Sequence, residues 1–103
     1  MESERDVKES LNSEVDRGSK ATALLENELL KEAFEVVSKQ YQHMWEHSDR
    51  GDTDTRERAW MLHDSLKQVI LHIHSVVETG KLAKKQLQDL GSETSFRRKF
   101  NII

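Results

Sequence analysis

The sequence contains no cysteine and no proline, and it has only four glycines among its 103 residues. Without cysteine, disulfide bonds and thiolate metal sites are excluded. Few glycines and no prolines argue against an all-β sandwich, which needs many turns, and favour long helices. No apolar run approaches the roughly 18 residues of a membrane span, and the polar start MESERDVKES is unlike a signal peptide. We therefore expect a cytoplasmic, all-α protein with no membrane contact.

Charged residues are abundant but nearly balanced in sign. They make up 34% of the chain, hydrophobic residues make up 35%, and the formal net charge is −3. This net charge is too small to suggest a protein that binds DNA over its whole surface or a strongly acidic DNA mimic. A chain of this length forms at most one small domain, and its apolar content is low for a self-sufficient core.

The stretch from Asp54 to Val76 carries the longest hydrophobic period of the chain, with apolar residues at steps of three and four. This spacing predicts an amphipathic helix from about Thr53. The apolar stripe along one side of this helix must be covered by other protein surface. The stripe stays in register through Gly80 to Leu90, so we expect a continuous or bent helix that ends at Gly91-Ser92; the alternative is a break at Gly80. The stripe residues are Ala59, Leu62, Leu66, Val69, Ile73 and Val76, followed by Gly80, Ala83, Leu87 and Leu90.

A second amphipathic helix is predicted from Asn27 to His47, with Asn27 as its N-cap. Two alternatives exist upstream: one helix from Ser19 to about His47, or a short helix followed by a longer one from Asn27. The apolar stripe consists of Leu30, Phe34, Val37, Tyr41 and Met44.

The two long helices flank a short break at residues 48–53. Gly51 can end a helix in the left-handed conformation, and Asp52, Thr53 or Asp54 can cap the next one, with Asp54 and Glu57 at the capping-box spacing. The short loop predicts an antiparallel helical hairpin with short flanking helical segments. We assign residues 1–18 to a flexible charged arm with a boundary at Gly18-Ser19, residues 19–90 to the helical domain and residues 91–103 to a basic, aromatic tail.

Self-association is expected because a two-helix hairpin leaves apolar surface uncovered. The stripe beyond Gly80 needs either the segment 19–26 or another copy of the chain to cover it. Tyr41, Trp45 and Trp60 should cluster near the loop; for Trp45 we favour the core, and for Trp60 the core and an exposed anchor are equally supported. The predicted interface residues are Trp60, Ile70, Val77, Leu87 and Leu90.

The spacing of the histidines in the sequence gives little support for an enzyme. His43, Glu46 and His47 match the H-x-x-E-H spacing of a zinc hydrolase, but a third ligand and a substrate cleft have no counterpart in the sequence. His72 and His74 project to opposite sides of a helix and cannot chelate one ion. We therefore expect no catalytic, metal or cofactor site.

The C-terminal tail brackets three positive charges with aromatic residues. A docking peptide for a protein partner is the favoured interpretation; nucleic-acid binding by the basic and aromatic side chains, or an inert solubilising tail, are the alternatives. The residues concerned are Phe96, Arg97, Arg98, Lys99 and Phe100.

Four short motifs together resemble a group of uncharacterised helical proteins encoded by tailed bacteriophages and prophages among packaging and head genes. The motifs are Leu24–Asn27, Ala33-Phe34, Arg56–Trp60 and Gly80–Ala83, and the resemblance covers about residues 21–87. It implies a non-enzymatic protein in the cytoplasm of an infected bacterium, with phage or host proteins as partners, and assigns no functional residue. Many such relatives have proline after the asparagine, where this chain has Glu28.

These observations favour a helical assembly protein for genome packaging or head assembly, such as an adaptor or a small-terminase-like oligomer. The alternative is a protein that handles DNA or inhibits a host nuclease, acting through the basic tail. A histidine-based metalloenzyme is the least favoured hypothesis.

Overall fold

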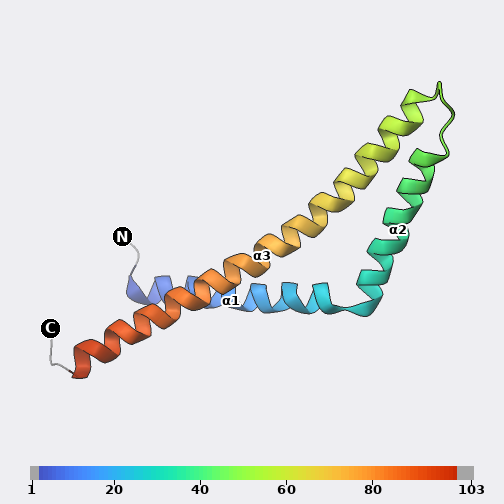
Figure 1. The fold of residues 1–103 in the computed structure, drawn as a ribbon. Helices are drawn as coiled ribbons and strands as arrows, with labels where there is room; N and C mark the ends of the chain where they lie inside the picture. The colour runs from blue at the N-terminus through green and yellow to red at the C-terminus, as the bar shows by residue number, and fades with distance from the viewer. Residues whose placement is uncertain (1–2, 100–103) are drawn as a thin grey trace. The chain divides into compact units, whose positions relative to one another are not determined.

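The computed structural model describes the backbone of residues 3–99 and the side chains of residues 3–92. It contains three helices: α1 (Glu4–Glu26), α2 (Glu28–Glu46) and α3 (Thr53–Lys99) (Figure 1). No strand occurs between residues 3 and 99, so the predicted all-α class is confirmed. The chain divides into two compact units, a central unit of residues 23–74 and a terminal unit formed by residues up to Thr22 and from Ser75 onward.

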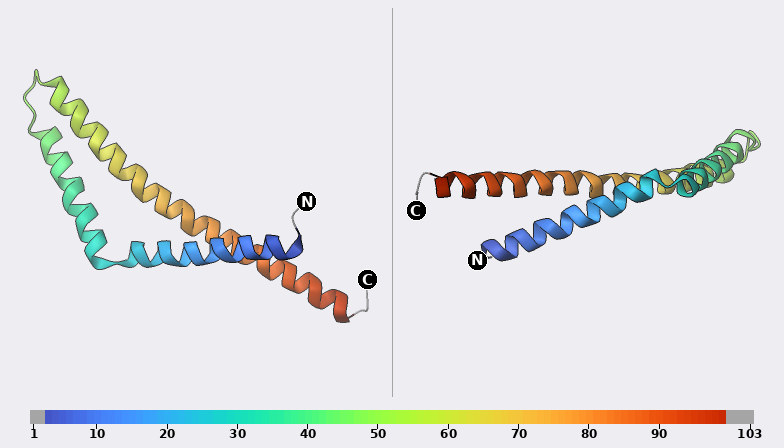
Figure 2. Two further views of the ribbon diagram at one scale, coloured as in Figure 1. Left: turned by 180° about the vertical axis from the view of Figure 1, so that it is seen from behind. Right: turned by 90° about the horizontal axis from the view of Figure 1, so that it is seen from below.

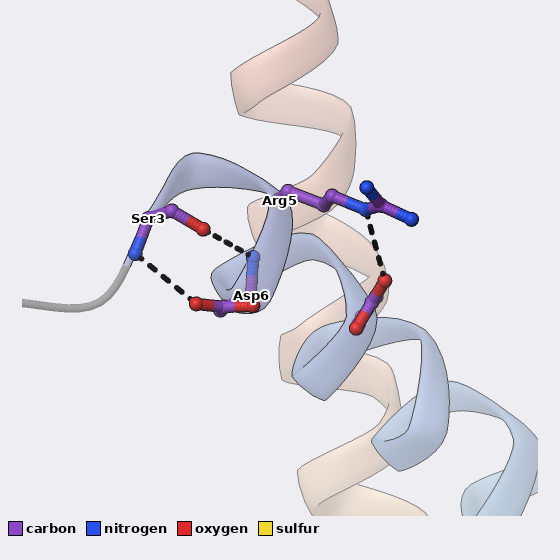
Figure 3. Close-up of polar contacts among 4 residues, drawn as sticks. Ser3, Arg5 and Asp6 are labelled. Atoms are coloured by element: carbon purple, nitrogen blue, oxygen red, sulfur yellow. Dashed lines mark hydrogen bonds and ion pairs between the residues drawn. The ribbon is translucent and has the colours of Figure 1, made fainter.

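Helix α1 corrects the expected arm and boundary, because no helix ends at Gly18-Ser19. Its first turn is capped reciprocally: the Ser3 hydroxyl accepts from the Asp6 amide at 3.1 Å, and the Asp6 carboxylate accepts from the Ser3 amide at 3.4 Å (Figure 3). A stripe of small and apolar residues runs through the segment that was expected to be an arm. This stripe comprises Val7, Leu11, Val15, Gly18 and Ala21, of which the last two are buried and the others half-buried.

Gly18 belongs to this packing stripe and is not a break between segments. A Cβ atom on Gly18 would lie 2.9 Å from the Cα of Gly80 on α3, so the two backbones approach each other too closely for any side chain. Ala21 and Ala83 are buried in the same unit, with 6% and 0% of their surface exposed. Helix α1 of the same chain therefore covers the far end of α3, and that overhang is no longer a reason to expect a second copy.

Asn27 separates α1 from α2. Its backbone is extended, with φ −68° and ψ 119°, and its side chain accepts a hydrogen bond from the amide of Leu30 at 2.9 Å. This is N-cap geometry, in which a side-chain oxygen satisfies one of the free amides of the first turn. Of the two predicted alternatives, the one with a separate helix starting at Asn27 is therefore confirmed. The helix before it is long, however, and not short as expected.

Replacing Glu28 with proline should preserve this junction and raise the free energy of unfolding by about 0.4–1 kcal/mol. Glu28 is the first residue of α2, where an amide has no partner within the helix, and Asn27 already has the extended backbone that proline requires of its predecessor. Its ion pair with Lys31, at 3.7 Å on the surface, contributes little. Urea unfolding followed by circular dichroism measures the effect.

Lys31→Pro is the matched control, because the Lys31 amide donates to the Asn27 carbonyl at 3.0 Å. This variant should lose about 3 kcal/mol. Equal losses for Glu28→Pro and Lys31→Pro would contradict the position of the helix start.

Helix α3 begins after the cap Asp52, not at a box formed by Asp54 and Glu57. The Asp52 carboxylate accepts from the Thr55 hydroxyl at 2.6 Å and from the Thr55 amide at 3.1 Å. These two bonds, the hydroxyl first, lower the pKa of Asp52 below its ordinary value. The cap therefore stabilises the fold above the carboxyl's unfolded pKa, and this contribution is lost as the pH falls through the lower, folded value.

Two expectations about glycine in and after the loop are wrong. The φ of Gly51 lies outside the left-handed region, so Gly51 does not end α2 in the expected way. Helix α3 passes through Gly80, as predicted, but it also passes through Gly91-Ser92 and ends at Lys99 (Figure 2). An internal glycine costs a helix only about 1 kcal/mol, and no proline follows that would stop it.

Candidate functional site

In the central unit, α2 and the first part of α3 run in opposite directions on the two sides of the loop and lie nearest to each other toward that loop (Figure 1). The Ser38 hydroxyl lies 3.0 Å from Nε2 of His63, and nearer the loop Tyr41 and Trp45 share a cavity with Ala59 and Trp60. On α2 the half-buried apolar positions are the predicted Leu30, Phe34, Val37 and Tyr41, whereas Met44 is exposed. We call the row of buried and half-buried positions along α2 and along the first part of α3 the seam.

The α3 side of the seam differs from the predicted stripe by one residue at alternate positions. Leu62 and Val69 are exposed, whereas their neighbours His63 and Ile70 are half-buried. The seam positions on α3 are therefore Ala59, His63, Leu66, Ile70 and Ile73. The hydrophobic pattern favours Leu62 over its neighbour His63, but Ser38 gives the His63 ring a polar partner inside the seam.

One edge of the seam carries both tryptophans of the chain. Trp45 lies four residues after Tyr41, about 40° round α2 from that seam position, and Trp60 follows Ala59, about 100° round α3 in the same sense. Both rings are largely exposed, at 52% and 63%. They line a cavity of about 330 Å³, which we call the tryptophan cavity; its walls are Tyr41, Gln42, Trp45, Glu46, Ala59, Trp60 and His63. The predicted clustering is confirmed, the core position favoured for Trp45 is wrong, and Trp60 is exposed.

The opposite edge carries aliphatic residues that each precede a seam position by one. Because the two helices are antiparallel, residues that precede the seam on either helix lie on the same side of the unit, away from the tryptophans. We call this set the aliphatic edge; its members are Leu29, Val36, Leu62 and Val69, all exposed. Large apolar side chains gathered along one edge are typical of a surface that contacts a partner.

Charges of both signs accompany the aliphatic edge. Leu62 lines a groove of about 390 Å³ with Met61, and the same groove contains Asp54, Glu57 and Arg58. The edge thus carries acidic and basic groups side by side. Glu35 follows the seam position Phe34 and so lies on the other side of α2, where it accepts a hydrogen bond from Lys39 at 2.9 Å; this bond and the lysine charge lower the pKa of Glu35.

The other four predicted interface residues are half-buried, and their role in an interface stays a prediction. Ile70 lies in the seam of the central unit. Val77 lines a groove of about 290 Å³ in the terminal unit together with Val15 and Gly18 of α1. Leu87 and Leu90 are half-buried on α3. Of the five predicted interface residues, only Trp60 is exposed.

The histidines of the H-x-x-E-H motif interact with each other. Their ring centroids lie 3.9 Å apart in a stacked arrangement, and Nδ1 of His47 donates to the carbonyl of His43 at 3.0 Å. Among the side chains of residues 3–92, no group of three histidine, aspartate or glutamate residues is placed to hold a metal ion.

The tail residues Phe96, Arg97, Arg98 and Lys99 have a helical backbone at the end of α3, and their side chains, like all of Phe100, lie outside the described part of the structure. Binding of protein or nucleic acid by the tail therefore stays a prediction. Within the described residues, no helix is long and apolar enough to cross a membrane.

Comparison with known proteins returned no matching family model, no similar curated protein and no similar solved structure. The site is therefore defined by this chain's own geometry. It has two parts, the aliphatic edge and the tryptophan cavity, on opposite sides of the same seam.

Proposed function

We propose that this protein is a non-enzymatic helical assembly protein that works as a homo-oligomer. The aliphatic edge carries the proposal, because Leu29, Val36, Leu62 and Val69 expose large apolar side chains along one side of the antiparallel helix pair. Covering such an edge removes apolar surface from water, which is the main favourable term in protein association. The resemblance to phage proteins encoded among packaging and head genes suggests that the assembly serves packaging or head formation.

A second copy of the chain is the occupant that best matches the charges. A two-fold interface brings the same patch together from both subunits, so the patch must be complementary to itself. The groove beside Leu62 satisfies this requirement, because it contains Asp54 and Glu57 together with Arg58. In a two-fold pair the acidic groups of one copy can face the arginine of the other.

Val69→Asp should dissociate the oligomer while leaving the helices folded. Val69 is 52% exposed, so a carboxylate there is solvated in the single chain but would be buried in the assembly. We expect light scattering to give a multiple of the monomer mass for the unchanged protein and the monomer mass for the variant. Circular dichroism checks that the helix content is kept.

Leu71→Asp is the matched control, because Leu71 is 48% exposed but follows the seam residue Ile70 and so lies away from the aliphatic edge. This variant should remain oligomeric. A monomer at high concentration for the unchanged protein, or equal dissociation by both variants, would overturn the proposal.

A further inference from the structure

The tryptophan cavity combines three aromatic side chains with a single carboxylate. Tyr41 and Trp45 come from α2 and Trp60 from α3, and Glu46 lies one residue beyond Trp45. None of the seven lining residues is a lysine or an arginine. The faces of aromatic rings carry negative potential, most strongly in tryptophan, so this lining attracts positive charge and offers nothing that repels it permanently.

A basic side chain on α3 close to Trp60 in the sequence is held by the loop. Arg56 lies one turn before Trp60, and its guanidinium donates to the carbonyls of Asp49 at 3.0 Å and Arg50 at 3.1 Å. These bonds direct the charge of Arg56 to the loop. The cavity is therefore left for a cation from outside the chain.

The hydrogen-bonding groups of the cavity narrow the class of cation. Nε2 of His63 is paired with Ser38 at 3.0 Å; Glu46, Gln42 and the Tyr41 hydroxyl are the acceptors on α2, whereas the Ala59 and Trp60 side chains of α3 supply none. A primary ammonium or a guanidinium has several N–H groups that each need an acceptor when they leave water. A fully alkylated ammonium has none, and its methyl groups make apolar contact with ring faces.

We infer that the tryptophan cavity binds a quaternary ammonium group. Trp45, Trp60 and Tyr41 provide the ring faces, Glu46 provides the balancing charge, and Ala59, which is 1% exposed, provides a floor without a bulky side chain. The site lies on the side of the seam opposite the aliphatic edge. It goes beyond the proposed assembly function, and its occupancy does not depend on that function.

The chain reports on this cavity by its own fluorescence, because its only two tryptophans both line the cavity. Titration of the full chain with tetramethylammonium chloride should give a saturable change in tryptophan emission. Tert-butanol, a neutral molecule of similar shape, and sodium chloride at equal ionic strength should give none. Choline and N-acetyl-trimethyllysine methylamide as further probes distinguish a small-molecule source from a methylated protein.

Two variants test the assigned groups. Trp60→Ala should weaken tetramethylammonium binding about tenfold, with Trp45 still reporting, and Trp60→Phe should recover part of the loss. Glu46→Gln should weaken binding by a few-fold, because it removes the only carboxylate in the lining. Met61→Ala is the control, since Met61 is exposed next to Trp60 but does not line the cavity.

Folding of each variant is checked by circular dichroism, and ligand-observed NMR of the methyl protons gives a measurement independent of fluorescence. Equal binding of tert-butanol would show a merely apolar pocket and would overturn the inference. So would the absence of a saturable response to tetramethylammonium in both measurements, or unchanged affinity in Trp60→Ala.

Discussion

Gly80→Ala should destabilise the terminal unit, although alanine is the better helix former. A Cβ atom on Gly80 would lie 2.8 Å from the Cα of Gly18 and 3.1 Å from the carbonyl oxygen of Glu14. Both neighbours are backbone atoms of α1, so neither can turn aside as a side chain would. The helices must move apart, and the buried Ala21 and Ala83 lose their close packing.

The magnitudes decide the sign of this effect. Alanine gains about 1 kcal/mol over glycine within a helix, whereas overpacking of a close contact costs about 1–3 kcal/mol, and a backbone clash is near the upper end. We expect a net loss of about 1–2 kcal/mol in the free energy of unfolding, measured by urea denaturation. Amide hydrogen exchange should become faster in α1, where the contact is lost.

Gly91→Ala is the matched control on the same helix. No atom lies within 4 Å of a Cβ placed on Gly91, so this substitution gains helix propensity without a clash. It should raise the free energy of unfolding by up to about 1 kcal/mol. If Gly80→Ala stabilised the protein as much as Gly91→Ala does, the close approach of α1 and α3 would be wrong.

Ile70→Asp should unfold the central unit, whereas the same change at the next residue should be tolerated. Ile70 is half-buried in the seam, and a carboxylate there loses apolar contact and faces a desolvation cost. We expect a loss of about 2–4 kcal/mol. Leu71 is 48% exposed, so Leu71→Asp should change stability by no more than about 0.5–1 kcal/mol.

Thermal and urea unfolding, monitored by circular dichroism at low protein concentration, compares these two variants. Together with Val69→Asp, they form a series of three consecutive residues: one in the aliphatic edge, one in the seam and one exposed on the side opposite the aliphatic edge. A smaller loss for Ile70→Asp than for Val69→Asp in the isolated chain would restore the stripe predicted from periodicity and contradict the observed seam.

The difference between the predicted stripe and the observed seam shows that a hydrophobic pattern does not decide which of two adjacent residues is buried. Steps of three and four fit Leu62 and Val69 as well as His63 and Ile70, because adjacent residues lie only about 100° apart on a helix. Hydrophobicity favours leucine over histidine, so the sequence alone selects the former. The choice is made by the partner helix, where Ser38 lies 3.0 Å from the His63 ring.

Gly18 shows a second limit of the same kind. In a charged segment a glycine before a serine is typical of a boundary, and local sequence gives no reason to interpret it otherwise. Yet Val7, Leu11 and Val15 precede it at helical spacing, and this signal could have extended the predicted helix to the N-terminus. What local sequence does not contain is Gly80, 62 positions away, whose Cα would lie 2.9 Å from a Cβ on Gly18.

Sequence by itself determined the features that depend on neighbouring residues. These are the all-helical class, the N-cap at Asn27, the break before α3, the continuity of α3 through Gly80 and the gathering of Tyr41, Trp45 and Trp60 near the loop. Tertiary structure alone decided which face of α3 lies in the seam, that α1 covers its far end, and which apolar residues are left exposed. The physical reason is that caps and helical periods are set within a few residues, whereas burial is set by whichever helix lies opposite, and that helix is distant in the chain.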